Sequence, residues 1–218
     1  MPDHVDALKM GTQSFARSRP DSDRTPAGHV LQVETLPLEG LLLLTPPRLK
    51  EGRGCSSETC NTALLARIGM ASGSAFAQDH YSLLRQRGMV RGLHAQVAPG
   101  AQGKLVRCTR GAIWDVAVDV RTGSPTFGQW VSVTLNDENG SQFWIPPGFL
   151  HGFCTLTDHT EVHCQCTSPS DPTCARSLRW NDATLGIEWP VADGQAIISA
   201  HDAAAPPFSA VIDWFHYA

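Results

Sequence analysis

The stretch WVSVTLNDENGSQFWIPPGFLHGFCTLT, residues 130–157, decides the fold. In Val131–Leu135, apolar and polar side chains alternate, which predicts a strand with one buried face and one polar face. Asp137–Gly140 supplies residues typical of turns, and Gln142–Ile145 and Phe153–Thr157 again indicate strands. Short strands separated by turn residues therefore dominate this part of the chain.

The same pattern extends in both directions from this stretch. Leu31–Thr35 and Gly40–Thr45 indicate strands, while Thr59–Met70 carries apolar residues at roughly helical spacing and predicts one short helix. Many short strands at even spacing suit a jelly roll, so we expect an all-β jelly-roll β-barrel with a few short helices. The strands expected after residue 75 are Phe76–Tyr81, Gly92–Val97, Lys104–Arg110, Ala112–Val118, Trp130–Leu135, Gln142–Ile145, Phe153–Thr157 and Thr160–Cys166.

Composition narrows the class of function. The 218 residues carry a formal net charge of -4 and no run of Lys or Arg, so we expect no partner nucleic acid and no membrane. Residues 1–30 lack the basic and apolar blocks of a signal peptide, and we expect a flexible leader there and one domain over residues 31–218. The seven Cys at irregular spacing favour reduced thiols and a cytoplasmic protein.

Four short segments hold more polar side chains than a packed core needs. In the first, His94 and Gln96 share one face of a strand, and Arg91 lies near its start. In the second, Lys104 opens a strand, and in the third a Pro-Pro-Gly turn precedes His151. The four segments are Met89–Gln96, Ala101–Arg107, Trp144–Phe153 and Ser199–Pro206.

The third segment bears on metal binding. With Gly140 ahead of it, it fits the second signature of cupin barrels, a Gly followed by Pro-x-Gly-x-x-His, which delivers His151 into the barrel mouth. The first cupin signature needs two His one residue apart and a later Glu, but this chain has His94 and Gln96 there. Two imidazoles are too few for a metal site, so we expect no metal. Residues 163–166, His-Cys-Gln-Cys, look zinc-like, but strand alternation separates the His from both Cys, and buried thiols are the better interpretation.

Together these segments resemble the dTDP-4-dehydrorhamnose 3,5-epimerase family, whose members have a cupin-type jelly-roll β-barrel. The resemblance covers residues 31–207, and the ordered series of motifs is specific for that family. The densest matches are Arg91–His94, Ala101–Arg107, Asp115–Asp119, Ser124–Trp130, Trp144–Pro146, His151–Phe153, Arg179–Asp182, Leu185–Pro190 and Asp202–Pro206.

The resemblance implies a catalytic pair and a partner for an oxyanion. His94 matches the residue that abstracts the proton beside the sugar's C4 ketone, and Asp202 matches the residue that orients this base. An imidazole titrates near neutral pH, and a carboxylate on its far nitrogen fixes the tautomer. Lys104 matches the residue that stabilises the enolate oxygen. Taken singly, His94 could equally be a hydrogen-bonded barrel histidine and Lys104 a solvated surface charge.

The resemblance also implies positions that hold a sugar nucleotide. His151 and Arg91 match residues near the sugar and the diphosphate. Arg53 and Glu58 match a pair that holds the nucleotide, commonly across a dimer interface, although a surface ion pair is the alternative for them. The full set of matching positions is Arg53, Glu58, Gln78, Arg91, His151 and, in place of a Lys, His201.

Cys164 is the main departure from the family. The family's general acid is a Tyr on the strand after the His-Gly-Phe turn, and the matching position is Cys164. Three alternatives follow. The thiol, of reference pKa about 8.5 against about 10 for Tyr, replaces the phenol; water or another residue delivers the proton; or the protein binds sugar nucleotides without epimerising them. Aromatic residues of the family are also replaced at Cys55–Ser57 and Ser170, which reduces stacking on the nucleobase.

We therefore expect an epimerase that abstracts a proton at C3, C5 or both of a nucleoside-diphosphate 4-keto-6-deoxyhexose, with dTDP as the expected nucleotide, for deoxysugar biosynthesis. The expected roles are His94 as base, Asp202 as its orienter, Lys104 as enolate stabiliser and Cys164 as acid. The resemblance implies a homodimer and no cofactor. A non-catalytic sugar-nucleotide binder is the competing class, and a metal-dependent cupin oxygenase comes third.

Overall fold

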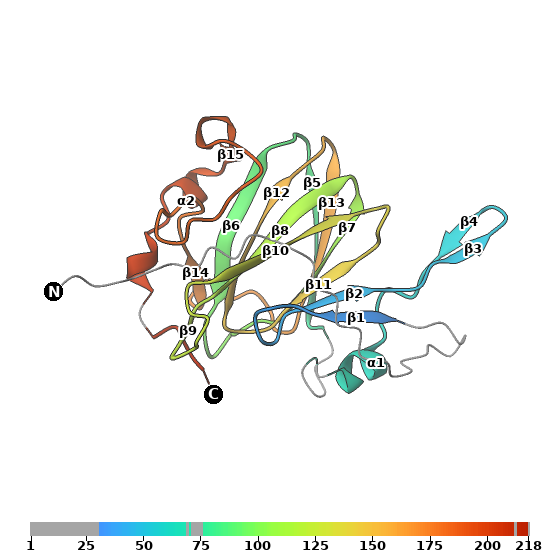
Figure 1. Cartoon of the computed structure of the whole chain (residues 1–218), viewed down its shortest axis with the longest axis horizontal. Coiled ribbons are helices and arrows are strands. Elements are labelled where there is room, and N and C mark those ends of the chain that lie inside the picture. Colours follow the sequence, from blue (N-terminus) through green and yellow to red (C-terminus); the bar gives the residue numbers. More distant parts are fainter. Residues whose placement is uncertain (1–30, 69, 71–75, 212, 218) are drawn as a thin grey trace.

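Two largely antiparallel β-sheets face each other and make up most of the molecule (Figure 1). The structure is a computed structural model, which describes residues 31–68, 70, 76–211 and 213–217. The first sheet has the strand order β1-β2-β11-β7-β13-β5. Its strands are β1 (Gln32–Thr35), β2 (Leu42–Thr45), β11 (Gln142–Ile145), β7 (Lys104–Arg110), β13 (Thr160–Cys166) and β5 (Gln78–Leu84).

The second sheet lies across the core from the first. It has the order β10-β8-β12-β6-β14, and β15 is added to β6 as a parallel strand. Its strands are β10 (Trp130–Asn136), β8 (Ala112–Asp119), β12 (Phe149–Thr155), β6 (Met89–Gln96), β14 (Ala175–Ser177) and β15 (Ile197–Ile198).

The main hydrophobic core lies between the two sheets. It combines Val106 and Phe143 of the first sheet with Ala117 and Phe153 of the second, and all four are buried. Because side chains alternate along a strand, positions two residues away from these face the same interior. Backbone pairing among the described residues does not join the two sheets, so the barrel is a flattened jelly roll. The predicted β-rich jelly roll with few helices is confirmed.

Most of the predicted elements are present, with some changed boundaries. The expected strand Phe153–Thr157 is instead β12, which begins at Phe149 because that residue already pairs with Asp119 of β8. The expected helix Thr59–Met70 is shorter, α1 (Thr62–Arg67), because the side chain of Asn61 caps its first turn. Three strands match their predicted ranges, namely β7, β11 and β13.

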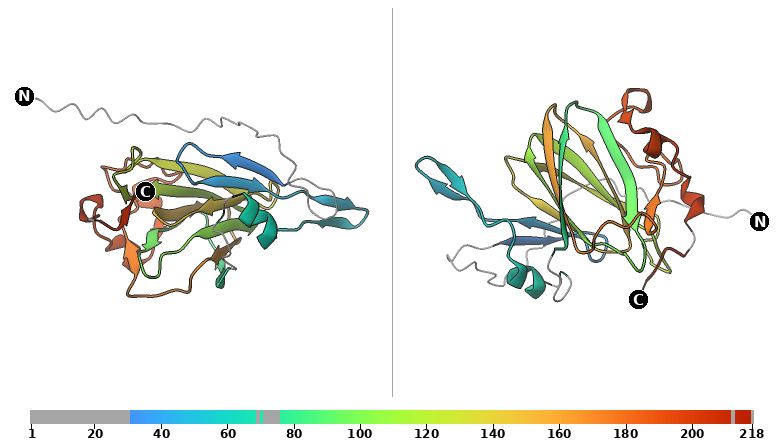
Figure 2. Two further views of the ribbon diagram at one scale, coloured as in Figure 1. Left: turned by 90° about the horizontal axis from the view of Figure 1, so that it is seen from below. Right: turned by 180° about the vertical axis from the view of Figure 1, so that it is seen from behind.

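The sequence pattern does not predict several short elements. Runs of two to four residues are too short to show a period of either helix or strand. Among them, β3 and β4 form a hairpin that projects from the sheets at the end of the molecule opposite α2 (Figures 1 and 2). The elements not predicted include β14 and β15. The others are β3 (Leu49–Glu51), β4 (Gly54–Ser56), β9 (Arg121–Thr122), β16 (Phe215–His216), α2 (Ala200–Ala203) and two 3₁₀ turns, Asp193–Gln195 and Phe208–Ala210.

The chain after β14 covers the outer face of the second sheet. Val116 and Leu150 project from this face, and they are buried in one cluster with Leu178 and Leu185 of the covering segment. Burial of this apolar surface holds the segment against the sheet. The packing brings α2 beside β6, on the side of the molecule where the predicted site lies (Figure 2).

Three observations bear on the predicted organisation and compartment. All seven cysteines are free thiols, which agrees with the expected reduced state. In the described part of the chain, no helix is long and apolar enough to cross a membrane. The predicted flexible leader, residues 1–30, lies outside the described residues.

Gly92 allows β6 to approach β12 closely, and its substitution is expected to destabilise the fold. A Cβ atom at Gly92 would lie 2.7 Å from Cα of Gly152 and 2.7 Å from the carbonyl oxygen of His151, and φ of Gly92 is +115°. We predict that Gly92→Ala lowers the free energy of unfolding by about 2–4 kcal/mol, since backbone strain and overpacking act together. Chemical denaturation followed by circular dichroism measures this change.

Gly52→Ala is the matched control for this prediction. Gly52 lies in the hairpin of β3 and β4, and an added Cβ would meet no atom within 4 Å. Its free energy of unfolding is therefore expected to stay within about 0.5 kcal/mol of the original. Equal stability of the two variants would contradict the close approach of β6 and β12 at Gly92.

Candidate active site

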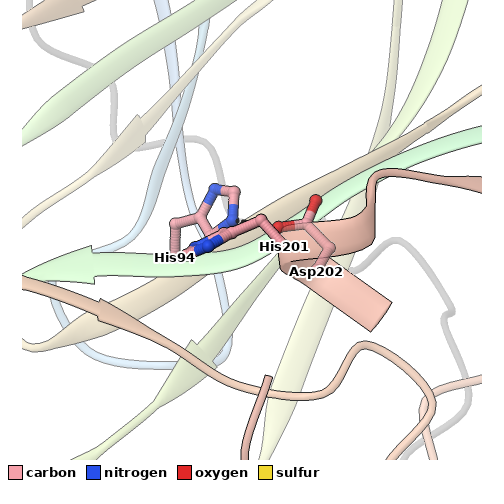
Figure 3. Close-up of side chains that lie close together, drawn as sticks. All are labelled: His94, His201 and Asp202. Atoms are coloured by element: carbon pink, nitrogen blue, oxygen red, sulfur yellow. Dashed lines mark hydrogen bonds and ion pairs between the residues drawn. The ribbon is translucent and has the colours of Figure 1, made fainter. Parts of the chain in front are cut away.

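His94 of β6 and Asp202 of α2 form a hydrogen-bonded pair (Figure 3). Nε2 of His94 lies 2.7 Å from Oδ1 of Asp202. The side chain of Asp202 is 4% exposed and that of His94 is 38% exposed, so a buried carboxylate supports a ring with an accessible edge. This is the arrangement of a general base with its orienting acid. The structure thus brings together the two residues expected to form the catalytic pair.

Local contacts fix the position of Asp202. The parallel pairing of β15 with β6 brings this part of the chain next to His94, and the Ser199 hydroxyl caps α2 by accepting the N–H of Asp202 at 3.1 Å. The second carboxylate oxygen of Asp202 accepts the N–H of Gly92 at 3.2 Å. Burial raises the pKa of Asp202, but the hydrogen bonds from His94 and Gly92 outweigh it and hold the pKa below its ordinary value. The carboxylate is therefore ionised at neutral pH.

A second histidine–carboxylate pair lies next to the first. Nε2 of His151 on β12 lies 2.8 Å from Oδ1 of Asp115 on β8, and both side chains are buried. His151 is opposite His94 in the strand register, so both imidazoles face the inter-sheet interior. Burial raises the pKa of Asp115, and the contact with His151 opposes this only in part. Asp115 was not among the predicted site residues, although a carboxylate flanked by apolar residues within a strand was an available signal.

Lys104 and Cys164 face the same interior from the first sheet. Lys104 opens β7 opposite Cys166 of β13, and Cys164 is opposite Val106. Val106 is fully buried in the inter-sheet core, so the alternating positions Lys104 and Cys164 also project inward. Nζ of Lys104 donates to Oε1 of Gln102 at 3.3 Å. The predicted oxyanion partner and the predicted acid therefore lie on the sheet across from the histidine–aspartate pair.

Cys164 and Cys166 form a thiol pair, with their Sγ atoms 3.8 Å apart. The hydrogen bond between the two sulfurs, together with burial, raises the pKa of Cys164 well above its ordinary value. The same hydrogen bond, aided by the charge of Lys104, lowers the pKa of Cys166 in spite of burial. Of the two thiols, Cys164 therefore keeps its proton to the higher pH. His163 lies on the outer face, with Nδ1 3.8 Å from a carboxylate oxygen of Asp79, so residues 163–166 do not converge as a zinc site.

Arg91 and Gln78 lie at the edge where β6 of one sheet approaches β5 of the other. Arg91 is exposed, and its guanidinium donates to the hydroxyl of Ser82 on β5 at 2.9 Å. Gln78 opens β5, and its Oε1 accepts the backbone N–H of Ser170 at 2.7 Å. Both predicted substrate-binding residues are thus held by contacts with other parts of the chain.

His201 lies next to His94 and Asp202, the pair predicted to be catalytic. It precedes Asp202 in α2 and is exposed, and its ring centroid lies 6.1 Å from that of His94. Nε2 of His201 is 3.1 Å from the hydroxyl of Ser177, which is opposite His94 in the pairing of β14 with β6. Figure 3 shows the two imidazoles and the carboxylate grouped together.

Within this chain, Arg53 and Glu58 lie away from the group of residues around His94. Arg53 lies in the turn between β3 and β4, and Glu58 follows β4; both are exposed. The hairpin projects at the end of the molecule opposite α2 in all three views (Figures 1 and 2). Within the chain, Glu58 accepts a hydrogen bond from Nδ2 of Asn61 at 3.3 Å.

This arrangement can move protons at a carbon beside a carbonyl group. An imidazole supported by a carboxylate can take a proton from one face of a bound molecule. The ammonium of Lys104 can stabilise the negative charge that develops on the carbonyl oxygen. A neutral thiol on the facing sheet can return a proton from the other side.

Comparison with known sequences agrees with this chemistry. A family model described as dTDP-4-dehydrorhamnose 3,5-epimerase matches residues 35–210. The chain is 42% identical over 184 residues to a dTDP-4-dehydrorhamnose 3,5-epimerase from Sinorhizobium fredii. The aligned region covers 84% of this chain and 93% of that protein. It is 44% identical over 166 residues to a dTDP-4-dehydrorhamnose 3,5-epimerase from Salmonella typhimurium. This aligned region covers 76% of this chain and 89% of that protein.

Solved structures show the same fold. A dTDP-6-deoxy-D-glucose-3,5-epimerase from Legionella pneumophila, in complex with dTDP-4-keto-L-rhamnose, has a TM-score of 0.81 and 36% identity, covering 87% of this chain and 100% of that chain. A 3'-monoepimerase from Streptomyces bikiniensis, in complex with dTDP-quinovose, has a TM-score of 0.73 and 34% identity. The match covers 80% of this chain and 86% of that chain. Because sequence and fold agree over most of its length, this chain belongs to the dTDP-4-dehydrorhamnose 3,5-epimerase family.

Proposed function

We propose that this protein epimerises a dTDP-linked 4-keto-6-deoxyhexose at C3, C5 or both, by proton transfer beside the ketone, in deoxysugar biosynthesis. The observation that carries the proposal is the 2.7 Å contact between His94 and Asp202, across the core from Lys104. Its relatives support the substrate class, since they include 3,5-epimerases and a 3'-monoepimerase, and two of them were solved with dTDP-sugars.

The first step is removal of a proton by His94. The lone pair of its accessible nitrogen takes the proton from the carbon beside the C4 ketone, and the ionised Asp202 stabilises the imidazolium that forms. The electron pair of the broken C–H bond moves toward the ketone oxygen and gives an enolate. Lys104 donates a hydrogen bond to this oxygen, which lowers the barrier most strongly in an interior shielded from water.

The second step is return of a proton from the opposite face. Cys164 faces the interior from the first sheet, and its raised pKa keeps the thiol protonated until an enolate lies against it. Transfer from sulfur to carbon inverts the centre and leaves a thiolate, which the charge of Lys104 stabilises. Exchange with solvent then returns the proton to Cys164 and removes the one held by His94, so the cycle balances.

The partner in this proposal is a second copy of the chain. Arg53 and Glu58 are exposed on a hairpin that projects away from their own site, which supports a homodimer in which each hairpin reaches the partner's nucleotide. A guanidinium suits a diphosphate because its fork donates two parallel hydrogen bonds. The seven free thiols support a reducing compartment, and we propose the cytoplasm.

A sugar-nucleotide binder without epimerase activity is the second candidate. The observation that favours it is Cys164 at the position where relatives are expected to carry a phenol, together with Ser170 in place of a second aromatic residue. Such a protein would bind the substrate and leave its C–H bonds intact. Isotope exchange therefore separates the two candidates.

Incubation with dTDP-4-keto-6-deoxyglucose in deuterium oxide is expected to place deuterium at C3 or C5, because His94 exchanges the abstracted proton with solvent. We predict that His94→Gln lowers the exchange rate by about 10²–10⁴-fold, as expected for loss of a general base. Mass spectrometry of the sugar nucleotide gives the rate, and proton NMR gives the labelled position.

His163→Gln is the matched control for the base. His163 is a histidine on the outer face of β13, paired with Asp79, and does not face the site. This variant is expected to exchange deuterium at the original rate. Substrate binding by the unmodified protein without any exchange would reject the epimerase and support the binder.

Cys164→Ser tests the proton donor. We predict that deuterium exchange continues, because His94 still removes and returns the proton on its own face, while the yield of inverted product falls by about 10²-fold. The reason is that a serine hydroxyl is a much weaker acid than a thiol. The stereochemistry of the product is read from NMR coupling constants of the sugar ring.

Cys108→Ser is the control for thiol loss. Cys108 is buried on β7, and its Sγ lies 3.1 Å from the carbonyl oxygen of Arg110, a bond that a serine hydroxyl can keep. Both exchange and inversion are expected to be unchanged in this variant. Unchanged inversion in Cys164→Ser would remove Cys164 from the mechanism and favour proton delivery by water.

A further inference from the structure

His94, His201 and Asp202 form a cluster of three potential metal ligands. One ligand atom from each residue lies within 4.8 Å of the corresponding atoms of the other two. Figure 3 shows the two imidazole rings and the carboxylate close together. In the described part of the chain, this is the one group of three or more His, Cys, Asp or Glu side chains that meets this spacing.

The donor set suits a borderline divalent transition metal ion. Imidazole nitrogen and carboxylate oxygen bind Zn²⁺ at about 2.0–2.2 Å, so two ligands of one tetrahedral ion lie about 3.3 Å apart. His94 and Asp202 are already closer than this, at 2.7 Å. Because the three ligand atoms lie within 4.8 Å of one another, binding requires His94 and Asp202 to separate slightly and the exposed His201 side chain to move closer to them.

Neighbouring groups bond to two of the three side chains, His201 and Asp202. The hydroxyl of Ser177 lies 3.1 Å from Nε2 of His201, and the N–H of Gly92 donates to the second carboxylate oxygen of Asp202 at 3.2 Å. Hydrogen bonds of this kind orient ligands around protein-bound metals and strengthen their binding. The exposure of His201 also leaves a route by which an ion can enter from solvent.

We propose that His94, His201 and Asp202 bind one divalent ion of the Zn²⁺ class, and that the bound ion inhibits the enzyme. The ion would bind Nε2 of His94 and so replace the hydrogen bond to Asp202 that orients the base, and substrate turnover and metal binding therefore exclude each other. The inhibition rests on the proposed function, whereas the binding of the ion does not. A two-histidine, one-carboxylate set is sufficient for such an ion when solvent fills the remaining position.

His201→Lys is the decisive variant for binding. Lysine keeps a long polar side chain at this exposed position but carries a positive charge and no lone pair at neutral pH. In calorimetric titration of the reduced, metal-free protein with Zn²⁺, we expect one ion per unmodified chain and an affinity at least about tenfold weaker in His201→Lys. His163→Gln is expected to bind like the unmodified protein, because His163 lies on the outer face. Equal affinity in His201→Lys, or no binding to the unmodified protein, overturns the site.

The thiol pair is a competing location for the ion, and Co²⁺ distinguishes the two. The sulfurs of Cys164 and Cys166 are 3.8 Å apart, so they could also bind a thiophilic metal. Co²⁺ bound to His94, His201 and Asp202 is expected to lack the thiolate-to-cobalt charge-transfer band in its absorption spectrum. A strong band of this type would place the ion on the thiols and overturn the proposal.

Inhibition is measured by deuterium exchange in the presence and absence of Zn²⁺. The quantity compared is the ratio of the two rates within each variant, which does not depend on how fast each variant works. One equivalent of Zn²⁺ is expected to lower the rate of the unmodified protein at least about tenfold, and that of His201→Lys less than twofold. A rate that is unchanged or raised when Zn²⁺ is bound overturns the inhibition. Absence of exchange without metal would reject the proposed function, while the calorimetric result would still decide the site.

Discussion

The contact between His94 and Asp202 depends on the docking of the C-terminal segment onto the second sheet. The two residues are 108 positions apart in the chain, and no local structure brings them together. Burial of Leu178 and Leu185 against the outer face of the sheet holds the segment, and the pairing of β15 with β6 then sets its register. The packing that stabilises the fold therefore also determines the geometry of the proposed base, His94.

The two-sheet architecture separates the groups that the proposed mechanism places on opposite faces of the substrate. His94 and His151 project from the second sheet, whereas Lys104 and Cys164 project from the first. Asp115 has one carboxylate oxygen that is buried and without a hydrogen-bond partner among the described residues. An unsatisfied buried acceptor is costly, so this oxygen is suited to accept a hydrogen bond from a substrate hydroxyl or from water.

Sequence periodicity predicts the parts of the fold whose side chains alternate over a sufficient length. It located β7 and β13 within their observed bounds and placed Lys104 at the start of a strand. It could not locate α2, because four residues show no period, and Asp202 was identified only through the family motif. The pairing of Asp115 with His151 was missed, because it is a contact between neighbouring strands that neither motif nor alternation specifies.

In the proposed mechanism, a thiol pair takes the place of the phenol expected from the family resemblance, and this changes the balance of charge around Lys104. A thiolate on Cys166, favoured by its hydrogen bond with Cys164, competes with the enolate for the ammonium of Lys104. The neutral form of the pair therefore leaves Lys104 most able to stabilise the enolate. A thiol is also shorter than a phenol, so the reacting carbon has to approach β13 more closely. The proposed proton transfer by Cys164 thus depends on how near the first sheet the sugar can lie.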